Sequence, residues 1–376
     1  NVINDNAGMD ARCSACGALA DPHPSVWRCA CGGAWEPIEI TDFDPMLIER
    51  DDFSVWRYHR LFGLGAEQPL LRMGVGWTPL LNLSISGRPI TFKLEFMMPS
   101  GSFKDRGTTV MINHMASWGV TSVVDDSSGN AGASLAAHAA RAGMQATICV
   151  PAYASPAKKA QIAVYGAEVV SVEGPRRNAE HAAQAAATNG RVYASHAYQP
   201  SYLIGQMTAA WEVWEQLGRR APDWVVTPVA QGGNLLGYWF GFRRLRAAGL
   251  IDKEPRLVAV QSALVDPVAE ALERGLDTVP GIEPKGYTVA EGIAVSQPAR
   301  GNRLLQAIRD TDGAAITVEE ATILDAQRTL ARQGIYVEPT SATAVAALPR
   351  VFELARPDDV IVVPLTGSGL KGAPKL

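Results

Sequence analysis

The chain has few cysteines, little net charge and no long hydrophobic run. Only 5 of its 376 residues are cysteine, and cysteines this sparse are typical of the reducing cytoplasm. No apolar stretch approaches the roughly 20 residues that a membrane-spanning helix requires, so a spanning protein is excluded. Lysine and arginine number 34 and aspartate and glutamate 38, which gives a net charge of −4. Neither a membrane nor nucleic acid is therefore an expected partner.

The beginning of the chain carries no export signal. Residues 1–10 are polar and lack the basic and apolar regions of a signal peptide. The sequence does not begin with Met, and Met9 is a candidate native start, with the residues before it as a leader. Together with the sparse cysteines, these features predict a cytoplasmic location.

Length and composition favour a folded protein of two or three domains. The 376 residues are 47% hydrophobic and 19% charged, which excludes a disordered or collagen-like chain. Strands are predicted at 120–124, 146–150, 168–172, 191–194, 224–229, 257–261 and 360–365, and helices at 131–141, 155–165, 205–217, 235–248 and 319–333. Apolar strands that alternate with helices predict an α/β fold with parallel sheets covered on both faces.

Four of the five cysteines are clustered near the beginning of the chain. Within nineteen residues they form one C-x-x-C and one C-x-C pair, each followed by glycine: Cys13, Cys16, Cys29 and Cys31. Paired thiolates of this kind suit a tetrahedral structural zinc site, so a small zinc-ribbon-like segment is expected. Because C-x-C is tighter than the usual spacing, the alternative is a metal-free ribbon held by packing of Trp27 and Trp35. Cys149 lies in an apolar run and is expected to be an inert core thiol.

Lys104 stands in a loop, 99–107, that opens a predicted helix. The positive end of a helix dipole favours the neutral amine, which is the nucleophile that Schiff-base chemistry requires. The loop lacks the Gly-Lys-Ser/Thr of a nucleotide-binding Walker loop. The alternative is an ordinary surface lysine paired with Asp105.

Two further loops each follow a strand and open a helix. Residues 127–132 include Asn130, and residues 230–234 include paired glycines. Backbone N–H groups at a helix N-terminus bind carboxylates and phosphates, although the first of these loops also suits a plain helix cap. Three such loops at the carboxyl ends of parallel strands predict one ligand cleft.

Eight motifs then occur in a fixed order across nearly the whole chain after Pro79. They are Gly76-Trp77-Thr78-Pro79-Leu80, Lys93-Leu94-Glu95, 99–107, 128–132, Gly205-Gln206-Met207-Thr208, Gly232-Gly233-Asn234, Glu338-Pro339-Thr340-Ser341-Ala342 and 365–371. These motifs and their order resemble those of the fold-type-II pyridoxal 5'-phosphate (PLP) enzymes, and among them those of the threonine synthase-like group. The cysteine pairs resemble the ribbon that some threonine synthases carry.

The resemblance implies a PLP-dependent lyase acting on a small amino acid, and a homodimer. Lys104 resembles the catalytic lysine that forms the Schiff base with PLP and moves the α-proton. The other implied cofactor-binding residues are Phe103, Asn130 at the ring hydroxyl, Gln231, Gly232, Gly233 and Asn234 at the phosphate, and Thr366 at the pyridine nitrogen. A neutral hydroxyl at that nitrogen favours elimination and replacement at side-chain carbons. The implied substrate-binding residues are Ser128, Gly129, Ala131, Gln199 and Tyr202.

The chain departs from the family where the substrate side chain is expected. Tyr202 stands in place of an arginine, Ile204 of a glutamate and Met207 of a lysine, and Gln231 begins the phosphate loop where glycine is usual. Loss of two cationic groups predicts that phosphohomoserine, the substrate of threonine synthases, is used poorly. Cysteate synthase-like and serine/threonine ammonia-lyase reactions remain alternatives. So does a non-enzymatic binding or regulatory relative, although Lys104 argues against it.

The predicted division of the chain has three parts. Residues 1–40 form a leader and the ribbon, residues 41–107 and 195–376 a large PLP domain, and residues 108–194 a small α/β domain. PLP is expected between the last two.

Overall fold

A computed structural model describes residues 9–20, 22–38, 43–64 and 71–372. The chain forms two compact units, each built from separate stretches of sequence. Unit 1 comprises Asn1–Ile40, Asp44–Gly76 and Lys104–Gly205, and unit 2 comprises Thr41–Phe43, Trp77–Phe103 and Gln206–Leu376. The division into a ribbon, a large domain and a small domain stays a prediction.

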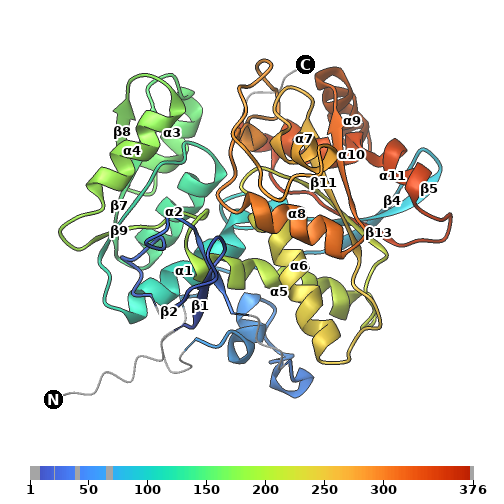
Figure 1. Cartoon of the computed structure of the whole chain (residues 1–376), viewed down its shortest axis with the longest axis horizontal. Coiled ribbons are helices and arrows are strands. Elements are labelled where there is room, and N and C mark those ends of the chain that lie inside the picture. Colours follow the sequence, from blue (N-terminus) through green and yellow to red (C-terminus); the bar gives the residue numbers. More distant parts are fainter. Residues whose placement is uncertain (1–8, 21, 39–42, 65–70, 373–376) are drawn as a thin grey trace. The chain divides into compact units, whose positions relative to one another are not determined.

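Unit 1 contains a four-stranded parallel sheet in the order β8-β7-β6-β9 (Figure 1). The strands are β6 (Ser122–Asp125), β7 (Gln145–Pro151), β8 (Glu168–Val172) and β9 (Arg191–Tyr193). Side chains alternate along β6, so that Val123 joins a core with residues of α1 (Lys104–Ser117), α2 (Asn130–Arg141) and α3 (Pro156–Ala163). Val124 joins a second core with α4 (Arg176–Ala186). Both faces of the sheet are therefore covered, as the apolar strands predicted.

The cysteine-rich segment of unit 1 forms a small antiparallel sheet. Its order is β2-β1-β3, with β1 at Ala11–Cys13, β2 at Leu19–Ala20 and β3 at Trp35–Pro37. The core of this sheet is small and contains Ala11, Cys13, Cys29 and Trp35. So little buried apolar surface supplies little stability, which is why ribbons of this size commonly depend on a bound metal.

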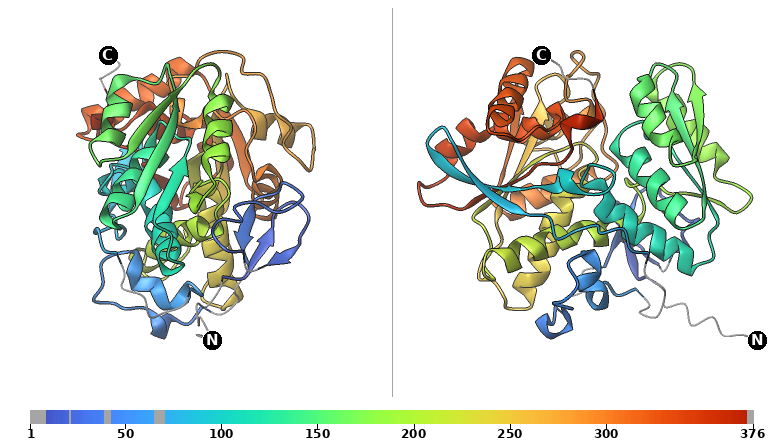
Figure 2. Two further views of the ribbon diagram at one scale, coloured as in Figure 1. Left: turned by 90° about the vertical axis from the view of Figure 1, so that its left-hand side faces the viewer. Right: turned by 180° about the vertical axis from the view of Figure 1, so that it is seen from behind.

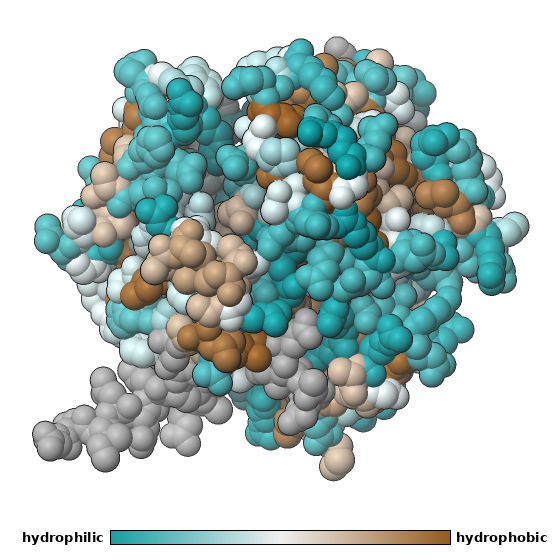
Figure 3. Space-filling model, in the orientation of Figure 1, coloured by the Kyte–Doolittle hydropathy of each residue, from teal (hydrophilic) through white to brown (hydrophobic). Residues whose placement is uncertain are grey.

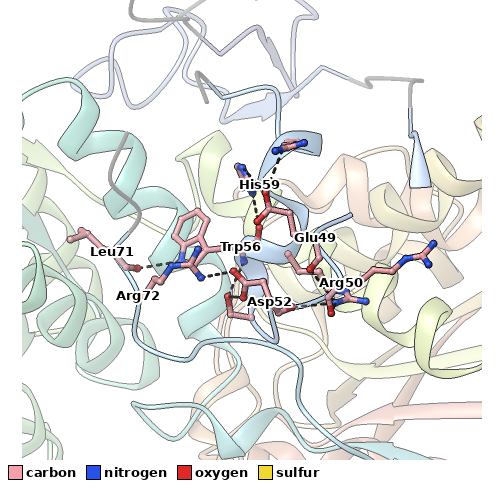
Figure 4. Close-up of polar contacts among 10 residues, drawn as sticks. Glu49, Arg50, Asp52, Trp56, His59, Leu71 and Arg72 are labelled. Carbon is pink, nitrogen blue, oxygen red and sulfur yellow. Dashed lines mark hydrogen bonds and ion pairs between the residues drawn. The ribbon is translucent and has the colours of Figure 1, made fainter. Parts of the chain in front are cut away.

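Short 3-10 helices and polar contacts fix the segments 44–64 and 71–76 (Figure 4). These helices are η1 (Pro45–Leu47) and η2 (Val55–Leu61). The buried guanidinium of Arg57 donates to the carbonyl oxygens of Glu49, Arg50 and Asp52. The indole N–H of Trp56 donates to the carbonyl of Leu71 at 3.3 Å. The last residues before the motif at Gly76 are thereby tied to the rest of unit 1.

Unit 2 contains a six-stranded sheet in the order β12-β11-β10-β13-β5-β4 (Figure 2). The strands are β4 (Leu80–Ile85), β5 (Arg88–Lys93), β10 (Trp224–Pro228), β11 (Arg256–Ser262), β12 (Ala314–Val318) and β13 (Ile361–Pro364). Only the β4–β5 hairpin is antiparallel among these pairs of the described chain. The helices and 3-10 turns are η3 (Glu95–Met97), α6 (Gly233–Ala247), α7 (Pro267–Glu273), η4 (Glu291–Ile293), α8 (Gly301–Asp310), α9 (Glu320–Arg332), α10 (Pro339–Ala346), α11 (Leu348–Leu354) and η5 (Gly369–Lys371).

Helix α5 (Pro200–Gln216) is longer than the sequence predicted. It begins at Pro200, the first helical position that proline favours, whereas the predicted helix begins at residue 205. Gly205 lies inside the helix, where its backbone packs tightly against the carbonyl of Arg106. A glycine that looks like a helix start is here a close-packing position.

No described helix is long and apolar enough to cross a membrane. On the face drawn in Figure 3, apolar residues form scattered groups among hydrophilic ones.

A buried ion pair joins β5 to α5 in unit 2. The Lys93 ammonium lies 2.8 Å from the Glu212 carboxylate, and both side chains are fully buried. Lys93 also donates to the carbonyl of Thr78 at 2.6 Å and to Gln216 at 2.9 Å. The second oxygen of Glu212 accepts the backbone N–H of Trp77. The pair thus holds the strand, the helix and the motif 76–80 together.

Breaking this pair should strongly destabilise the protein. In Glu212→Leu the buried ammonium loses its counter-ion, so the free energy of unfolding in urea should fall by about 3–5 kcal/mol. The double variant Lys93→Met/Glu212→Leu should recover much of that loss, because it leaves no buried charge unpaired. Asp325→Asn is the control, since Asp325 pairs with Arg328 on the surface and should cost less than about 1 kcal/mol. Equal losses in Glu212→Leu and Asp325→Asn would contradict the assignment.

Candidate active site

Backbone hydrogen bonds in unit 2 hold the segment before Lys104 against the segment after β13. The N–H of Phe103 donates to the carbonyl of Thr366 at 2.9 Å, and the N–H of Ser368 donates to the carbonyl of Gly101 at 3.0 Å. Ser102 and Gly367 also pair in an isolated antiparallel β-bridge. Phe103, a predicted cofactor-binding residue, is thereby fixed, and Lys104 follows it directly as the first residue of α1.

Thr366 offers a buried hydroxyl to a ligand. Its backbone N–H donates to the hydroxyl of Ser341 at 2.8 Å, and its side chain is 2% exposed. Within the described residues, the Thr366 hydroxyl has no hydrogen-bond partner. A buried polar group left unpaired is costly, so it calls for a partner from outside the protein. The resemblance predicts the ring nitrogen of PLP as this partner.

The loop between β10 and α6 provides an anion site in unit 2. Gly232 has a φ of +83°, and α6 begins at Gly233, so backbone N–H groups of a 15-residue helix face the loop. A side chain at Gly232 would also collide with Leu304. The buried amide nitrogen of Asn234 has no partner in the described part of the chain. These donors suit the phosphate of PLP.

Gln231 uses its side chain within the protein. Its amide oxygen accepts the backbone N–H of Ala299 at 2.9 Å, which connects the phosphate loop to the segment before α8. Its contact with PLP stays a prediction, as do those of Gly232, Gly233, Asn234 and Thr366.

In unit 1, a buried hydrogen bond ties the first turn of α1 to α2. Asp105, which follows Lys104, is fully buried and accepts the hydroxyl of Ser134 at 2.6 Å. His138 lies one helical turn further on α2, 4.0 Å from the same carboxylate. Since α1 begins with Lys104 and α2 begins with Asn130, the contact fixes both residues on one rigid pair of helices.

The loop 127–132 packs closely against the first turn of α2. The Ser127 hydroxyl accepts the N–H of Gly129 at 3.3 Å. A Cβ at Gly132 would lie 1.8 Å from the carbonyl oxygen of Ser127, so only glycine fits there. Ser128 and Gly129 are half-buried and Ala131 is buried. The backbone N–H groups at this end of α2 suit a carboxylate, which is the predicted role of Ser128, Gly129 and Ala131.

Two acidic residues before this loop were not singled out from the sequence. Asp126 accepts the hydroxyl of Tyr193 at 2.6 Å and the guanidinium of Arg176 at 3.3 Å. Burial, together with the negative charge of Asp126, raises the pKa of Asp125 to about 7. In the sequence, these residues can be recognised only as two aspartates at the carboxyl end of an apolar strand, where α/β sheets bind ligands.

Gln199 and Tyr202 have partners inside unit 1. The amide N–H₂ of Gln199 donates to the carbonyl oxygens of Pro24 and Tyr193, each at 2.9 Å. Tyr202 is fully buried, and its ring lies directly against Gly107 of α1. Their roles in substrate binding stay predictions.

The four clustered cysteines have the geometry of a metal site. The sulfurs of Cys13 and Cys31 are 3.5 Å apart, those of Cys16 and Cys29 are 3.7 Å apart, and all four lie within 4.8 Å of one another. Zinc–sulfur bonds of about 2.3 Å place the sulfurs of a tetrahedral site about 3.8 Å apart. The backbone N–H of Gly33 lowers the pKa of Cys31 to about 7, whereas burial raises the pKa of Cys13 to about 12, so the match to zinc is one of geometry and ligand type. The cluster therefore fits zinc.

Comparisons with known proteins agree with this arrangement. Residues 71–367 match the family described as pyridoxal-phosphate dependent enzyme. The threonine synthase of Methanocaldococcus jannaschii is 34% identical, over 96% of this chain and 93% of that protein. The threonine synthase of Methanosarcina acetivorans is 32% identical, over 96% of this chain and 91% of that protein.

A solved structure shares the fold. The threonine deaminase of T.th. superimposes with a TM-score of 0.67 at 28% identity, covering 79% of this chain and 94% of that one. The predicted α/β fold of a fold-type-II PLP enzyme is thereby confirmed. The chain therefore belongs to the family of pyridoxal-phosphate dependent enzymes, in which it is a lyase similar to threonine synthases.

Proposed function

We propose that the chain catalyses elimination or replacement at the side chain of a small amino acid, with a substrate less anionic than phosphohomoserine. The observation that carries the proposal is the unpaired, buried Thr366 hydroxyl, which backbone hydrogen bonds hold beside the residue preceding Lys104. A hydroxyl suits a neutral ring nitrogen, whereas a carboxylate would keep that nitrogen protonated. A cofactor ring with a neutral nitrogen withdraws electrons less strongly from the attached amino acid. This weaker withdrawal favours reactions at side-chain carbons.

The roles of this chain's residues follow from where they stand. PLP, when bound, makes the α-proton of an attached amino acid acidic. The amine of Lys104 would hold the cofactor covalently and, after the substrate amine has displaced it, would be free to take the α-proton. Backbone N–H groups of 128–131 hold the substrate carboxylate, and those at the start of α6 hold the cofactor phosphate. The buried hydroxyl of Thr366 and the buried amide nitrogen of Asn234 form their missing hydrogen bonds to the same cofactor.

Relatives named threonine synthase and threonine deaminase support a reaction in which a β or γ substituent is lost. The choice of substrate rests on charge. Tyr202 and Met207 are both buried, and neither supplies the positive charge that a phosphate requires. Lys158, Lys159, Arg176 and Arg177 of unit 1 are the basic residues that could compensate. Of these, Lys159 donates to the carbonyl of Ala152 and Arg176 donates to Asp126.

The residues preceding the carboxylate loop supply no free positive charge for a phosphate either. Asp126 is paired with Arg176 at 3.3 Å, so the guanidinium is already compensated within unit 1. A serine or threonine ammonia-lyase reaction is therefore the second candidate, favoured by the structural similarity to threonine deaminase. We also propose that the protein acts in the cytoplasm as a homodimer, to be checked by sedimentation analysis.

Replacement of Lys104 should abolish turnover without unfolding the protein. Lys104→Ala removes the covalent nucleophile, so kcat should fall well beyond ~100-fold, while the phosphate loop still retains some PLP. Borohydride should attach the cofactor irreversibly to the peptide containing Lys104 in the natural protein, and not in the variant. Lys253→Ala, at an exposed lysine, is the control and should behave as the natural protein. Near-normal turnover in Lys104→Ala would refute the assignment.

A direct comparison of substrates should show which leaving group the enzyme prefers. The kcat/KM for O-phosphohomoserine should lie at least ~30-fold below that for the best of O-phosphoserine, serine and threonine, because a buried charged hydrogen bond is worth roughly 2–5 kcal/mol. Release of phosphate and of ammonia would be followed in parallel. Restoring charge with Met207→Lys should raise activity toward phosphohomoserine. Efficient threonine formation by the natural protein would show the substrate proposal to be wrong.

Metal analysis should find about one zinc per chain. The four thiolates complete a tetrahedral site, and Cys16→Ser should lower the zinc content several-fold. Chelation should loosen the residues of the ribbon and leave PLP bound. Cys149→Ser is the matched control, since Cys149 lies in the core of unit 1, and should not change the zinc content. An ordered ribbon in zinc-free protein would instead support packing alone.

A further inference from the structure

The segment between the two cysteine pairs packs against the small sheet of unit 1. The ring of Trp27 makes edge-to-face contacts with Tyr193 of β9 and with Tyr198, each at 4.9 Å between ring centres. Trp27 is half-buried and joins the core that α4 forms with the sheet. Edge-to-face pairs of this kind contribute beyond the area they bury. The ribbon is thus attached through one side chain to a defined strand.

A second contact joins the same two elements. Gln199, 2% exposed, donates from one amide group to both the Pro24 carbonyl and the Tyr193 carbonyl. Its two donors are therefore shared between the ribbon segment and the strand. Both contacts converge on Tyr193.

Tyr193 carries the connection to the carboxylate loop. Its hydroxyl donates to Asp126 at 2.6 Å, and Ser127, the first residue of loop 127–132, follows Asp126 directly. Burial, together with the nearby aspartates, raises the pKa of Tyr193, so the phenol stays protonated and remains a donor. Moving Tyr193 would move the anchor of the loop.

The cysteine cluster in turn fixes Trp27. Cys29 follows two residues later, and Arg28, between them, pairs with Ala34 in an isolated bridge. The indole N–H of Trp35, in the core of the ribbon, donates to the carbonyl of Val26 at 2.9 Å. Ordering the ribbon around a metal therefore sets the direction of the neighbouring Trp27 side chain.

We propose that Trp27 and Gln199 are positioning residues that couple the metal-bearing ribbon to loop 127–132, so that an ordered ribbon increases the affinity for the substrate carboxylate. The inference goes beyond the proposed reaction, and it rests on the proposed function only in taking this loop as the carboxylate site. It gives Gln199 a role at the ribbon rather than in contact with substrate. A ribbon that served stability alone would not act selectively on one loop.

Hydrogen exchange on the full-length protein with PLP and zinc bound tests the coupling. In Trp27→Ala, amides of 126–132 should exchange about tenfold faster, while those of α6 stay unchanged, because two aromatic contacts to Tyr193 and Tyr198 are lost. Trp27→Phe should keep most of the protection, since a ring remains. Val26→Ala is the matched control in the same segment, because its side chain is 49% exposed. Chelation of zinc from the natural protein should reproduce the effect of Trp27→Ala.

Kinetics supply the second readout. Trp27→Ala should raise KM for the amino-acid substrate about tenfold and change kcat less than twofold, with zinc and PLP contents unchanged. Unchanged exchange in 126–132 after both the substitution and chelation would overturn the proposal, as would equally faster exchange throughout the chain. If Trp27→Ala fails to fold, the Trp27→Phe and chelation measurements decide. Because exchange is measured without turnover, failure of the proposed reaction is distinguishable from failure of the coupling.

Discussion

Strands β5 and β13 lie side by side in parallel, although β6 to β12 all lie between them in the sequence (Figure 1). Parallel neighbours end at the same edge of a sheet, so the segments that follow them meet there and exchange backbone hydrogen bonds at 101–103 and 366–368. Every role proposed for Thr366, and the starting point of the helix that begins with Lys104, depends on that register. A slip of one residue would turn each of these side chains to the other face.

Each unit adds a buried polar contact that keeps its own part of the site in place. In unit 2 the Lys93–Glu212 pair anchors the end of β5, from which the lysine loop departs. In unit 1 the Asp105–Ser134 hydrogen bond joins the helices that begin with Lys104 and Asn130. Both contacts are buried away from water. In such surroundings the loss of one partner costs more free energy of folding than the intact contact contributes. Such contacts favour one arrangement strongly over its alternatives.

Local patterns allowed much of the fold to be predicted from the sequence. The strand at 168–172 is found at Glu168–Val172, and Lys104 does open a helix, because apolar runs and turn residues act over short distances. The start of α5 was missed because Gly205 is explained only by its contact with Arg106. Asp126, Tyr193 and Gln199 come together through pairing of separate strands and docking of the ribbon, and no local pattern encodes such contacts. Family motifs supplied the site residues that spacing alone would have left as caps and turns.

The position of β13 also bears on how the chain is made. It follows every other described strand in the sequence, yet it lies between β10 and β5. Until it leaves the ribosome, the growing chain of unit 2 holds two separate pieces of sheet, each with an open edge of the kind that promotes aggregation. Pairings between such distant segments form slowly. Completion of the sheet, and with it the arrival of Thr366, therefore has to wait until residues 361–366 have been synthesised, and a nascent chain that stops before residue 361 presents chaperones with unpaired strands instead of an enzyme.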